Sequence, residues 1–511
     1  GNAMSSQYET GYAFTTSAAQ WVMQAYIKAV NNDNDDSYGL YGATVDGDTI
    51  AVGAPWERSN QTTITNGTTA SSNNSNYRSG AAYVYKRTGT SWAQEAYIKA
   101  ANNNSSIQMN FGYLGAKISG DTLAVAGMYD ASNQTTITNG TSASTNTSRT
   151  MSGSVFVYKR YGSTWVQEAY IKASNAGQDD RFGVGLDLDE DTLAVRSMKE
   201  DSNQTTITNG TTSSSNNSNS SSGAVYVYKR TDGSWAQEAY IKAVNNQAGD
   251  QFGYPILNGD TLVATTNLED SNQTTITNGT TASTNNSSTD SGAVYVYKRT
   301  GSSWAQEAYI KASNGDASDA FGNSRYSAID GDTLVTGASL EDSNQNIVTN
   351  GTTASSNNSS TDSGAVYVYR RSGNAWAQEA YIKPSNSDAG DGFGISVSIS
   401  GNLLAVGATG EDSNQLTITN GSTASSNNDI SNSGAVYIFE RTGTSWAQVA
   451  YIKAPNPDVN DYFGRSVSLD NKTLLVTSMD DSNQTTITNG TTASADNSNT
   501  DSGAAYVFVL Q

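Results

Sequence analysis

Short apolar runs separated by turn residues recur along the whole chain, and each recurrence predicts four β-strands. The first two strands flank a tight turn, as in VSISGNLLAVGA (397–408) and AIDGDTLVTGA (328–338), because Gly and Asn tolerate the positive φ that such turns need. The third strand is SGAVYVYKR (291–299), rich in the β-branched and aromatic residues that suit a pleated surface. The fourth, SWAQEAYIKA (303–312), alternates apolar and polar residues.

Two markers advance in step through the chain, an aromatic-Gly pair and a Trp, each with a period of 69 to 73 residues. A fixed period over the whole length is the signature of a repeat fold. The pairs are Tyr38-Gly39, Phe111-Gly112, Phe182-Gly183, Phe252-Gly253, Phe321-Gly322, Phe393-Gly394 and Phe463-Gly464. The tryptophans are Trp21, Trp92, Trp165, Trp235, Trp304, Trp376 and Trp446.

Seven four-stranded units without helices predict an all-β fold, a single seven-bladed propeller over residues 21–511 with blades of about 70 residues around a channel. The chain ends in SGAAYVFVLQ (502–511), a third strand that no fourth strand follows. The missing strand stands at the start, in WVMQAYIKA (21–29). We therefore expect the ring to close by pairing residues 21–29 with the C-terminal blade.

The fourth strand ends in Lys in every repeat. Lysine on an outermost strand discourages edge-to-edge pairing, so we expect these side chains to protect the blade edges. They are Lys28, Lys99, Lys172, Lys242, Lys311, Lys383 and Lys453.

The motifs FG, EDSN, SGAVYVYKRTG and SWAQEAYIKA resemble the bacterial FG-GAP-repeat family, distant relatives of the integrin α-chain propeller. The resemblance covers residues 21–511 and implies an exported protein that works in adhesion or ligand binding rather than catalysis. Integrin-type repeats hold calcium in an Asp-rich loop between the first two strands. Here that connection is a short turn such as Asp330-Gly331-Asp332, so calcium is not expected at that place.

Carboxylates gather instead just before the aromatic-Gly pairs and again after the second strands, as in Glu269-Asp270 and Glu341-Asp342. Both groups are expected on one face of the ring, where hard oxygen ligands could hold Ca²⁺. The alternative is that these side chains hydrogen-bond their own turns. The candidate ligands are Asp33, Asp36, Asp180, Asp250, Asp316, Asp319, Asp388, Asp391, Asp458 and Asp461.

Each repeat inserts about 20 Ser-, Thr- and Asn-rich residues between its second and third strands, as in SNQTTITNGTTASTNNSSTD (271–290). We call these insertions the arms and expect them to form a crown on one face of the ring. Their sequons are candidate N-glycosylation sites. They are Asn60, Asn66, Asn133, Asn139, Asn203, Asn209, Asn272, Asn278, Asn350, Asn420, Asn483 and Asn489.

Composition removes several classes of function. The chain has no Cys and no His, which excludes structural zinc sites, Ser–His nucleophiles and disulfides. A net charge of -20 makes nucleic acid an unsuitable partner, and no apolar run approaches the ~18 residues that span a bilayer. The first residues, GNAMSSQ, show no signal-peptide pattern.

The innermost strands break the repeat most strongly, at residues predicted to line the channel. A small ligand would bind there, unless these side chains simply fill the tunnel. They are Tyr41, Lys117, Asp187, Tyr254, Arg325 and Arg465. Acidic pairs recur in every blade, whereas a catalytic pair should be unique, so we predict no enzyme.

Residues 1–20 form a tail that the seven-fold count does not use. Its segment GYAFTT (11–16), with Gly11, Tyr12, Ala13 and Phe14, imitates a third strand and could add to a neighbouring subunit or fold back on its own blade. We therefore expect a non-enzymatic extracellular or cell-surface protein, structural or adhesive, which forms a filament through this tail. The alternative is a carbohydrate- or protein-binding module that uses the crown.

Overall fold

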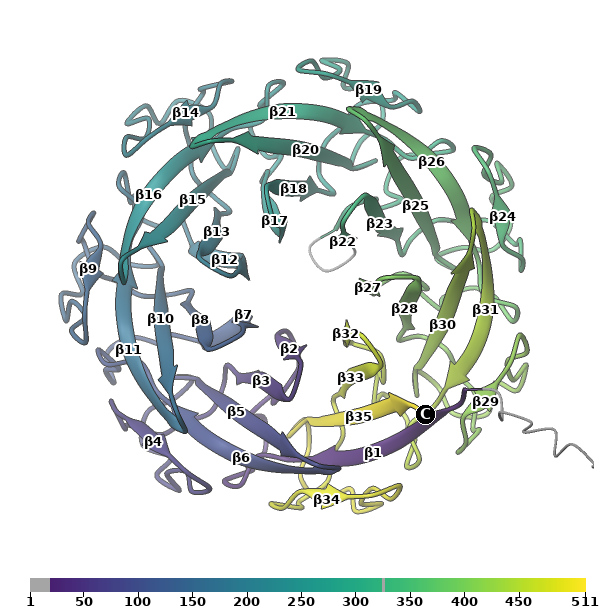
Figure 1. Cartoon of the computed structure of the whole chain (residues 1–511), viewed down its shortest axis with the longest axis horizontal. Coiled ribbons are helices and arrows are strands. Elements are labelled where there is room, and N and C mark those ends of the chain that lie inside the picture. Colours follow the sequence, from purple (N-terminus) through teal and green to yellow (C-terminus); the bar gives the residue numbers. More distant parts are fainter. Residues whose placement is uncertain (1–18, 324–326) are drawn as a thin grey trace, which may run out of the picture.

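The computed structural model describes residues 19–323 and 327–511. Their strands form seven sheets that stand in a ring around a central channel (Figure 1). The described residues contain no helix that could cross a membrane. The predicted seven-bladed all-β propeller is confirmed, with one difference: each blade has five antiparallel strands instead of four.

The two innermost strands of each blade form a hairpin, and we number the blades 1 to 7 by them. The innermost strands are β2 (Ala43–Asp46), β7 (Phe111–Ser119), β12 (Phe182–Asp189), β17 (Tyr254–Asn258), β22 (Ser327–Asp330), β27 (Ser396–Ser400) and β32 (Ser466–Asp470). The second strands are β3 (Thr49–Ala54), β8 (Thr122–Gly127), β13 (Thr192–Ser197), β18 (Thr261–Thr266), β23 (Thr333–Ala338), β28 (Leu403–Ala408) and β33 (Thr473–Ser478).

The next two strands are longer. The third strands are β5 (Ala81–Thr88), β10 (Ser154–Tyr161), β15 (Ala224–Thr231), β20 (Ala293–Thr300), β25 (Ala365–Ser372), β30 (Ala435–Thr442) and β35 (Ala504–Leu510). The fourth strands are β6 (Ser91–Ile98), β11 (Thr164–Ile171), β16 (Ser234–Ile241), β21 (Ser303–Ile310), β26 (Ala375–Ile382), β31 (Ser445–Ile452) and, in blade 7, β1 (Trp21–Ile27).

The N-terminal strand closes the ring as predicted. In Figure 1, purple β1 lies beside yellow β35, and their register runs from Trp21 opposite Leu510 to Ile27 opposite Ala505. Blade 7 thus takes three of its strands and its arm from the end of the chain and one strand from the start.

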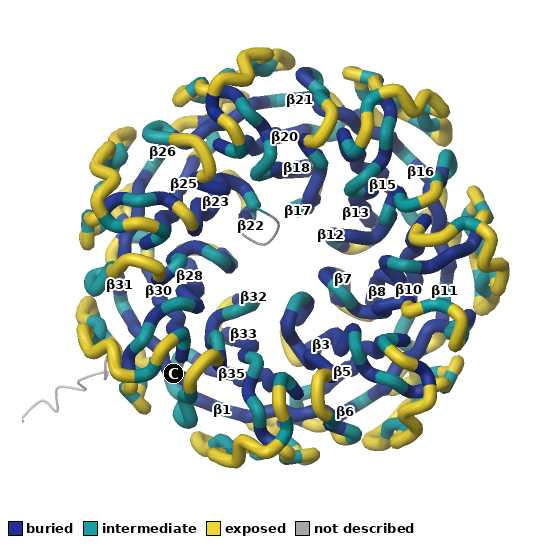
Figure 2. The backbone as a smooth tube through the Cα atoms, turned by 180° about the vertical axis from the view of Figure 1, so that it is seen from behind, coloured by how far each residue is buried: buried dark blue, intermediate teal, exposed yellow. Residues whose placement is uncertain are grey.

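The apolar core lies between the blades. Ala82 and Val84 of blade 1, for example, belong to one cluster of buried side chains with Phe111 and Phe156 of blade 2. In Figure 2, the buried residues, coloured dark blue, lie along the strands of the sheets. At Gly80 (φ +80°) a Cβ would lie 2.2 Å from the backbone oxygen of Phe111. Because the Gly of the SGA motif has no side chain, the backbone of the aromatic-Gly segment in the next blade can pack directly against it.

The fifth strands correct the expectation of a crown. The TITN part of each arm pairs antiparallel with the fourth strand of its own blade, so the arms surround the ring on its outer circumference (Figure 1). The fifth strands are β4 (Ile64–Asn66), β9 (Thr138–Asn139), β14 (Thr208–Asn209), β19 (Thr277–Asn278), β24 (Thr349–Asn350), β29 (Thr419–Asn420) and β34 (Thr488–Asn489).

The lysines at the ends of the fourth strands are not exposed edge protectors, which corrects a second expectation. All seven are buried. In blade 4, Lys311 Nζ donates to Glu269 Oε2 at 2.8 Å and to Ser291 Oγ at 2.8 Å. Each blade thus has one buried ion pair, in which the lysine meets a Glu in five blades and an Asp in blades 2 and 7. Removing one partner of such a pair typically costs about 3–5 kcal/mol.

The last Asn of each fifth strand fastens its blade to the next one, and we call this contact the Asn–Trp clasp. Between blades 4 and 5, Trp376 N donates to Asn278 Oδ1 at 2.7 Å, and Asn278 Nδ2 donates to Trp376 O at 3.2 Å. The same pair of atoms meets at all seven junctions. The clasps join Asn66 to Trp165, Asn139 to Trp235, Asn209 to Trp304, Asn278 to Trp376, Asn350 to Trp446, Asn420 to Trp21 and Asn489 to Trp92.

Replacing a clasp residue tests its contribution to stability. We expect Asn278→Ala to lower the free energy of unfolding by about 1–3 kcal/mol, because two hydrogen bonds between blades are lost. Urea unfolding followed by tryptophan fluorescence measures this change. The matched control is Asn272→Ala, an exposed residue of the same arm; equal effects of the two substitutions would contradict the clasp.

Candidate functional site

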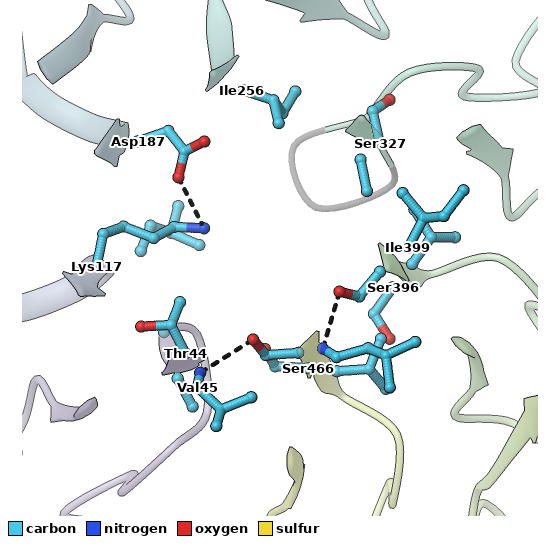
Figure 3. Close-up of a pocket in the computed structure, with 18 of the residues that line it drawn as sticks. Thr44, Val45, Lys117, Asp187, Ile256, Ser327, Ser396, Ile399 and Ser466 are labelled. Atoms are coloured by element: carbon cyan, nitrogen blue, oxygen red, sulfur yellow. Dashed lines mark hydrogen bonds and ion pairs between the residues drawn. The ribbon is translucent and has the colours of Figure 1, made fainter. Parts of the chain in front are cut away.

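The channel is lined by the innermost strands and holds a cavity of about 290 Å³. Figure 3 shows Lys117 of β7 and Asp187 of β12 pointing toward one another across the wall, with Lys117 Nζ 3.5 Å from Asp187 Oδ1. The other labelled side chains, such as Ile256 and Ser396, are neutral. Asp187 is the one carboxylate among the described residues that line this cavity.

Equivalent side chains in the wall link neighbouring innermost strands. Thr44 Oγ1 accepts from Ile118 N at 3.2 Å, and Ser468 Oγ accepts from Val45 N at 3.1 Å. Asp187 Oδ2 does the same with Leu257 N at 2.8 Å. Lys117 has no acceptor atom, so it cannot accept such a hydrogen bond and pairs with Asp187 instead. The pair is therefore a local variation of the hydrogen bonds that link neighbouring innermost strands.

The hairpin turns at one end of the channel form a complete ring of caps. Each turn residue accepts from a backbone N–H in the hairpin of the next blade, as Asp470 Oδ2 does from Gly47 N at 2.7 Å. The accepting residues are Asp46, Ser119, Asp189, Asn258, Asp330, Ser400 and Asp470. These side-chain hydrogen bonds link the hairpin turn of each blade to the hairpin turn of the next blade.

The residues that break the repeat in the innermost strands are only partly brought together. Tyr41 stacks near Tyr113, with ring centroids 4.5 Å apart, and the Arg465 guanidinium lies 5.6 Å from the Tyr41 ring centroid. Tyr41, Lys117, Asp187 and Tyr254 line the channel cavity, and Tyr254 also lines a second cavity that is described below. Arg325 falls outside the described residues.

The candidate calcium ligands support the turn-capping alternative. Asp319 Oδ2 accepts from Asp316 N at 2.8 Å, and Asp36, Asp180, Asp250, Asp391 and Asp461 each accept in the same way from the residue three positions earlier. The other four, Asp33, Asp316, Asp388 and Asp458, bind Asn side chains of the arms. Among the described residues no three acidic side chains are grouped to hold a metal ion.

A third contact occurs at six of the seven junctions between blades, and we call it the Arg–Trp triad. Between blades 1 and 2, Arg160 Nη1 lies 3.2 Å from Glu95 Oε2, to which Trp165 Nε1 also donates at 2.9 Å. The Arg160 guanidinium stacks 5.3 Å from the Trp165 ring centroid. Between blades 7 and 1 the acceptor is Gln24, and between blades 6 and 7 the triad is missing.

The family model described as "FG-GAP repeat" matches residues 304–369, 376–439 and 446–508. Each matched span begins in a fourth strand and ends in the third strand of the next blade, so the matched unit spans one junction. The chain is an FG-GAP-repeat β-propeller. The four further repeats of this FG-GAP propeller carry the same markers in step.

Three solved peptidase structures have low similarity to the FG-GAP propeller. They include an acylaminoacyl peptidase in complex with Z-Gly-Gly-Phe-chloromethyl ketone (9% identity, TM-score 0.41, 88% of this chain and 51% of that chain). A second is a Pyrococcus horikoshii acylaminoacyl peptidase (9% identity, TM-score 0.39, 88% of this chain and 51% of that chain). A third is a Mycobacterium tuberculosis puromycin-hydrolyzing peptidase (10% identity, TM-score 0.32, 89% of this chain and 60% of that chain). The chain thus spans about half to three fifths of their length. No curated protein matches the FG-GAP propeller.

The sequons fall into two groups in the FG-GAP propeller. The seven Asn-Gly sequons are the clasp residues, and the Nδ2 atom that would carry a glycan donates a hydrogen bond to the next blade. In the second group, Asn60, Asn133, Asn203, Asn272 and Asn483 are exposed on the arms, and their glycosylation stays a prediction. The strand-like residues Gly11, Tyr12, Ala13 and Phe14 lie outside the described residues.

Two features of the FG-GAP propeller were missed by reasoning from sequence. The clasp joins residues 95 to 99 positions apart at five junctions and 397 or 399 positions apart at the other two. The nearly constant step between an Asn-Gly and a later Trp was nevertheless a visible signal. The single Arg196 in the second strands was also visible, since the other second strands carry Gly, Ala or Thr at that position.

The buried capping aspartates predict a pH dependence of stability. Burial raises the pKa of Asp36 and Asp250 to about 8, and of Asp180, Asp319, Asp391 and Asp461 to about 7. Because the folded-state pKa lies above the unfolded value of about 3.9, the folded state binds more protons between these values. Stability is therefore expected to fall as the pH rises from 5 to 8.

Differential scanning calorimetry across this range tests the dependence. The variant Asp36→Asn/Asp250→Asn keeps an acceptor at both caps and removes two titrating groups, so its melting temperature should vary less with pH. Asp429→Asn, on an exposed arm, should leave the profile unchanged. A wild-type profile that rises from pH 5 to 8 would contradict the assignment.

Proposed function

We propose that this FG-GAP propeller is a non-enzymatic structural or adhesive protein of the extracellular space or cell surface, and that its copies associate through the junction of blades 6 and 7. The FG-GAP propeller fold fits a binding or structural module. Support for the assembly comes from one observation: this junction alone lacks the Arg–Trp triad among the described blades.

Two substitutions remove the triad together. Val449 stands where the other fourth strands carry Glu or Gln, and Leu510 stands where the other third strands carry Arg. The indole Nε1 of Trp21 is consequently buried without a hydrogen-bond partner. An unsatisfied buried donor costs about 1–3 kcal/mol, so the fold tolerates a local loss of stability here.

The same junction exposes apolar surface on the outer circumference. A groove of about 270 Å³ is lined by Trp21, Val22, Leu416 and Ile418. Leu416 is 58% exposed and occupies a position that is Thr in most other arms. The equivalent groove between blades 1 and 2 has Thr62 in place of Leu416. An exposed apolar side chain added to such a groove marks an interaction surface.

We assign this groove to residues 11–16 of a second copy. The fourth strand of each described blade is covered in part by a fifth strand of two or three residues and by a clasp, so we favour side-chain packing over the strand addition expected from sequence. Side-chain packing of Tyr12 and Phe14 into the groove remains available. A tail of 18 residues spans up to about 60 Å, enough to reach a neighbour.

The direction of the chain favours the tail of a neighbour over the protein's own tail. Gln20 and Gln511 exchange two backbone hydrogen bonds of 2.8 and 3.0 Å, so Gln20 continues the antiparallel pairing of β1 with β35. Gln20 itself lines the groove together with Trp21 and Val22. Because residue 16 stands only four positions before Gln20, the protein's own residues 11–16 would have to reverse direction at once to enter the groove. Contacts of this head-to-tail kind propagate into filaments.

The interactions that the carboxylates make support the proposal that the protein is not an enzyme. The Glu and Asp residues that follow the second strands, such as Glu269, neutralise buried lysines. The aspartates before the aromatic-Gly pairs cap turns. The channel cavity keeps a single carboxylate that is already paired, Asp187, whereas acid–base hydrolysis of a glycoside needs two.

Restoring the repeat at the altered junction tests the assembly. The variant Leu416→Thr/Val449→Glu/Leu510→Arg introduces the residues that the other junctions carry. We expect multi-angle light scattering and negative-stain imaging to show ordered oligomers for the wild type and monomers for the variant. Its melting temperature should rise, because Trp21 Nε1 gains an acceptor.

Two controls separate the explanations. Thr62→Leu adds an exposed leucine at the junction of blades 1 and 2, where the triad is intact, and should not change assembly. A chain that lacks residues 1–18 should be monomeric but should still bind a peptide of residues 9–18. Monomeric wild-type protein at high concentration would overturn the proposed assembly.

A further inference from the structure

The second strand of blade 3 carries an arginine at a position where other blades have small residues. Arg196 is equivalent to Gly53, Ala126, Thr265, Gly337, Gly407 and Thr477. At Gly53 a Cβ would lie only 2.2 Å from the carbonyl oxygen of Gly112 in the next blade. Side-chain space at this position is therefore narrow, and a long charged side chain there has a structural cost.

Arg196 is also buried without a carboxylate partner. The residue is 6% exposed, its Nη2 donates to the backbone oxygen of Gln251, and its Nε has no hydrogen-bond partner among the described residues. Burial lowers the pKa of Arg196 to about 10, so the guanidinium stays charged at neutral pH. Buried charges are normally paired, and the described structure leaves this one without a counter-ion.

A cavity of about 220 Å³ adjoins Arg196, and we call it the Arg196 pocket. A second guanidinium, from Arg181, lines it together with the rings of Tyr113, Tyr129 and Tyr254. No Asp or Glu is among the described residues that line the pocket. Arg181 is already paired with Asp179, whose Oδ1 lies 2.8 Å from Arg181 Nε, so Arg196 carries the positive charge of the pocket that has no counter-ion. In a protein with a net charge of -20, such a charge in a pocket without an acidic lining residue favours an anion.

The backbone of blades 2 and 3 departs from the repeat to shape this pocket. The pairing of β7 with β8 is interrupted between Phe111 and Ala116, and that of β12 with β13 between Phe182 and Leu186. The innermost hairpins of blades 4, 6 and 7 are regular. The two interruptions place Leu114 and Val184 at the pocket.

A glycine lets Tyr254 complete the wall. Gly185 has φ +100°, and a Cβ there would lie 2.7 Å from the Tyr254 ring. The ring therefore packs on bare backbone.

We propose that the Arg196 pocket binds a small organic carboxylate with a ring-shaped body, the carboxylate on the Arg196 guanidinium and the ring against the tyrosines. Arginine pairs with carboxylates in two-point geometry, and tyrosine rings present flat, amphipathic surfaces. The pocket volume is below the usual range of about 300–1,000 Å³ for drug-sized ligands, which limits the ligand to a single ring. Sugar acids and aromatic acids share this chemistry.

Isothermal titration calorimetry on the full chain distinguishes these sources. The probes are sodium glucuronate and sodium benzoate, with glucose, benzyl alcohol and sodium sulfate as matched compounds that lack the ring carboxylate. We expect one of the two carboxylates to bind at least tenfold more tightly than its neutral counterpart and than sulfate. Which of the two binds identifies the ring class.

The variant Arg196→Thr removes the charge and introduces the residue found at the same position in blades 4 and 7. We expect at least tenfold weaker binding together with an unchanged or higher melting temperature, since an unpaired buried charge is removed. Lys472→Thr, an exposed residue outside the pocket, should bind like the wild type. Failure of both carboxylates to bind the wild type, or equal binding by Arg196→Thr, would overturn the proposal.

Discussion

The stability of every blade depends on burial of its apolar faces by its neighbours. The clusters of buried side chains each combine residues of adjacent sheets, as Val84 and Phe156 do across the junction of blades 1 and 2. A single blade would expose both faces, so the interactions become complete only when the ring closes. This constraint explains why β1 pairs with β35 and why the polar residues of the repeat are placed at junctions.

Three polar layers align six of the seven junctions from the channel outwards, and two of these layers are present between blades 6 and 7. The turn caps hold neighbouring hairpins near the channel, the Arg–Trp triads join the outer strands, and the Asn–Trp clasps hold the circumference. Within each blade, a buried Lys–Glu or Lys–Asp pair secures the ends of the strands. Because these groups satisfy one another, many of the acidic and Asn residues of the repeat have a structural role at the junctions and turns.

The same regularity makes its exceptions informative. Two places depart from the repeat at a cost in stability: the unsatisfied Trp21 indole between blades 6 and 7, and the unpaired Arg196 guanidinium in blade 3. Functional sites are where proteins accept locally unfavourable groups. The proposed assembly surface and the proposed carboxylate pocket each coincide with one of these departures, on different parts of the ring.

The sequence alone determined the fold class, the number of blades and the closure of the ring, because period, strand pattern and turn chemistry are local properties. It did not determine the environment of single side chains. Lys311 was expected at an exposed edge and is buried, because Glu269, 42 residues away in the chain, neutralises it. The arms were expected on one face of the ring and lie on its circumference. The reason is that a short segment of each arm forms backbone hydrogen bonds with the fourth strand of its own blade. Contacts between residues far apart in sequence were decided by the tertiary structure, which alone brings their atoms within hydrogen-bonding distance.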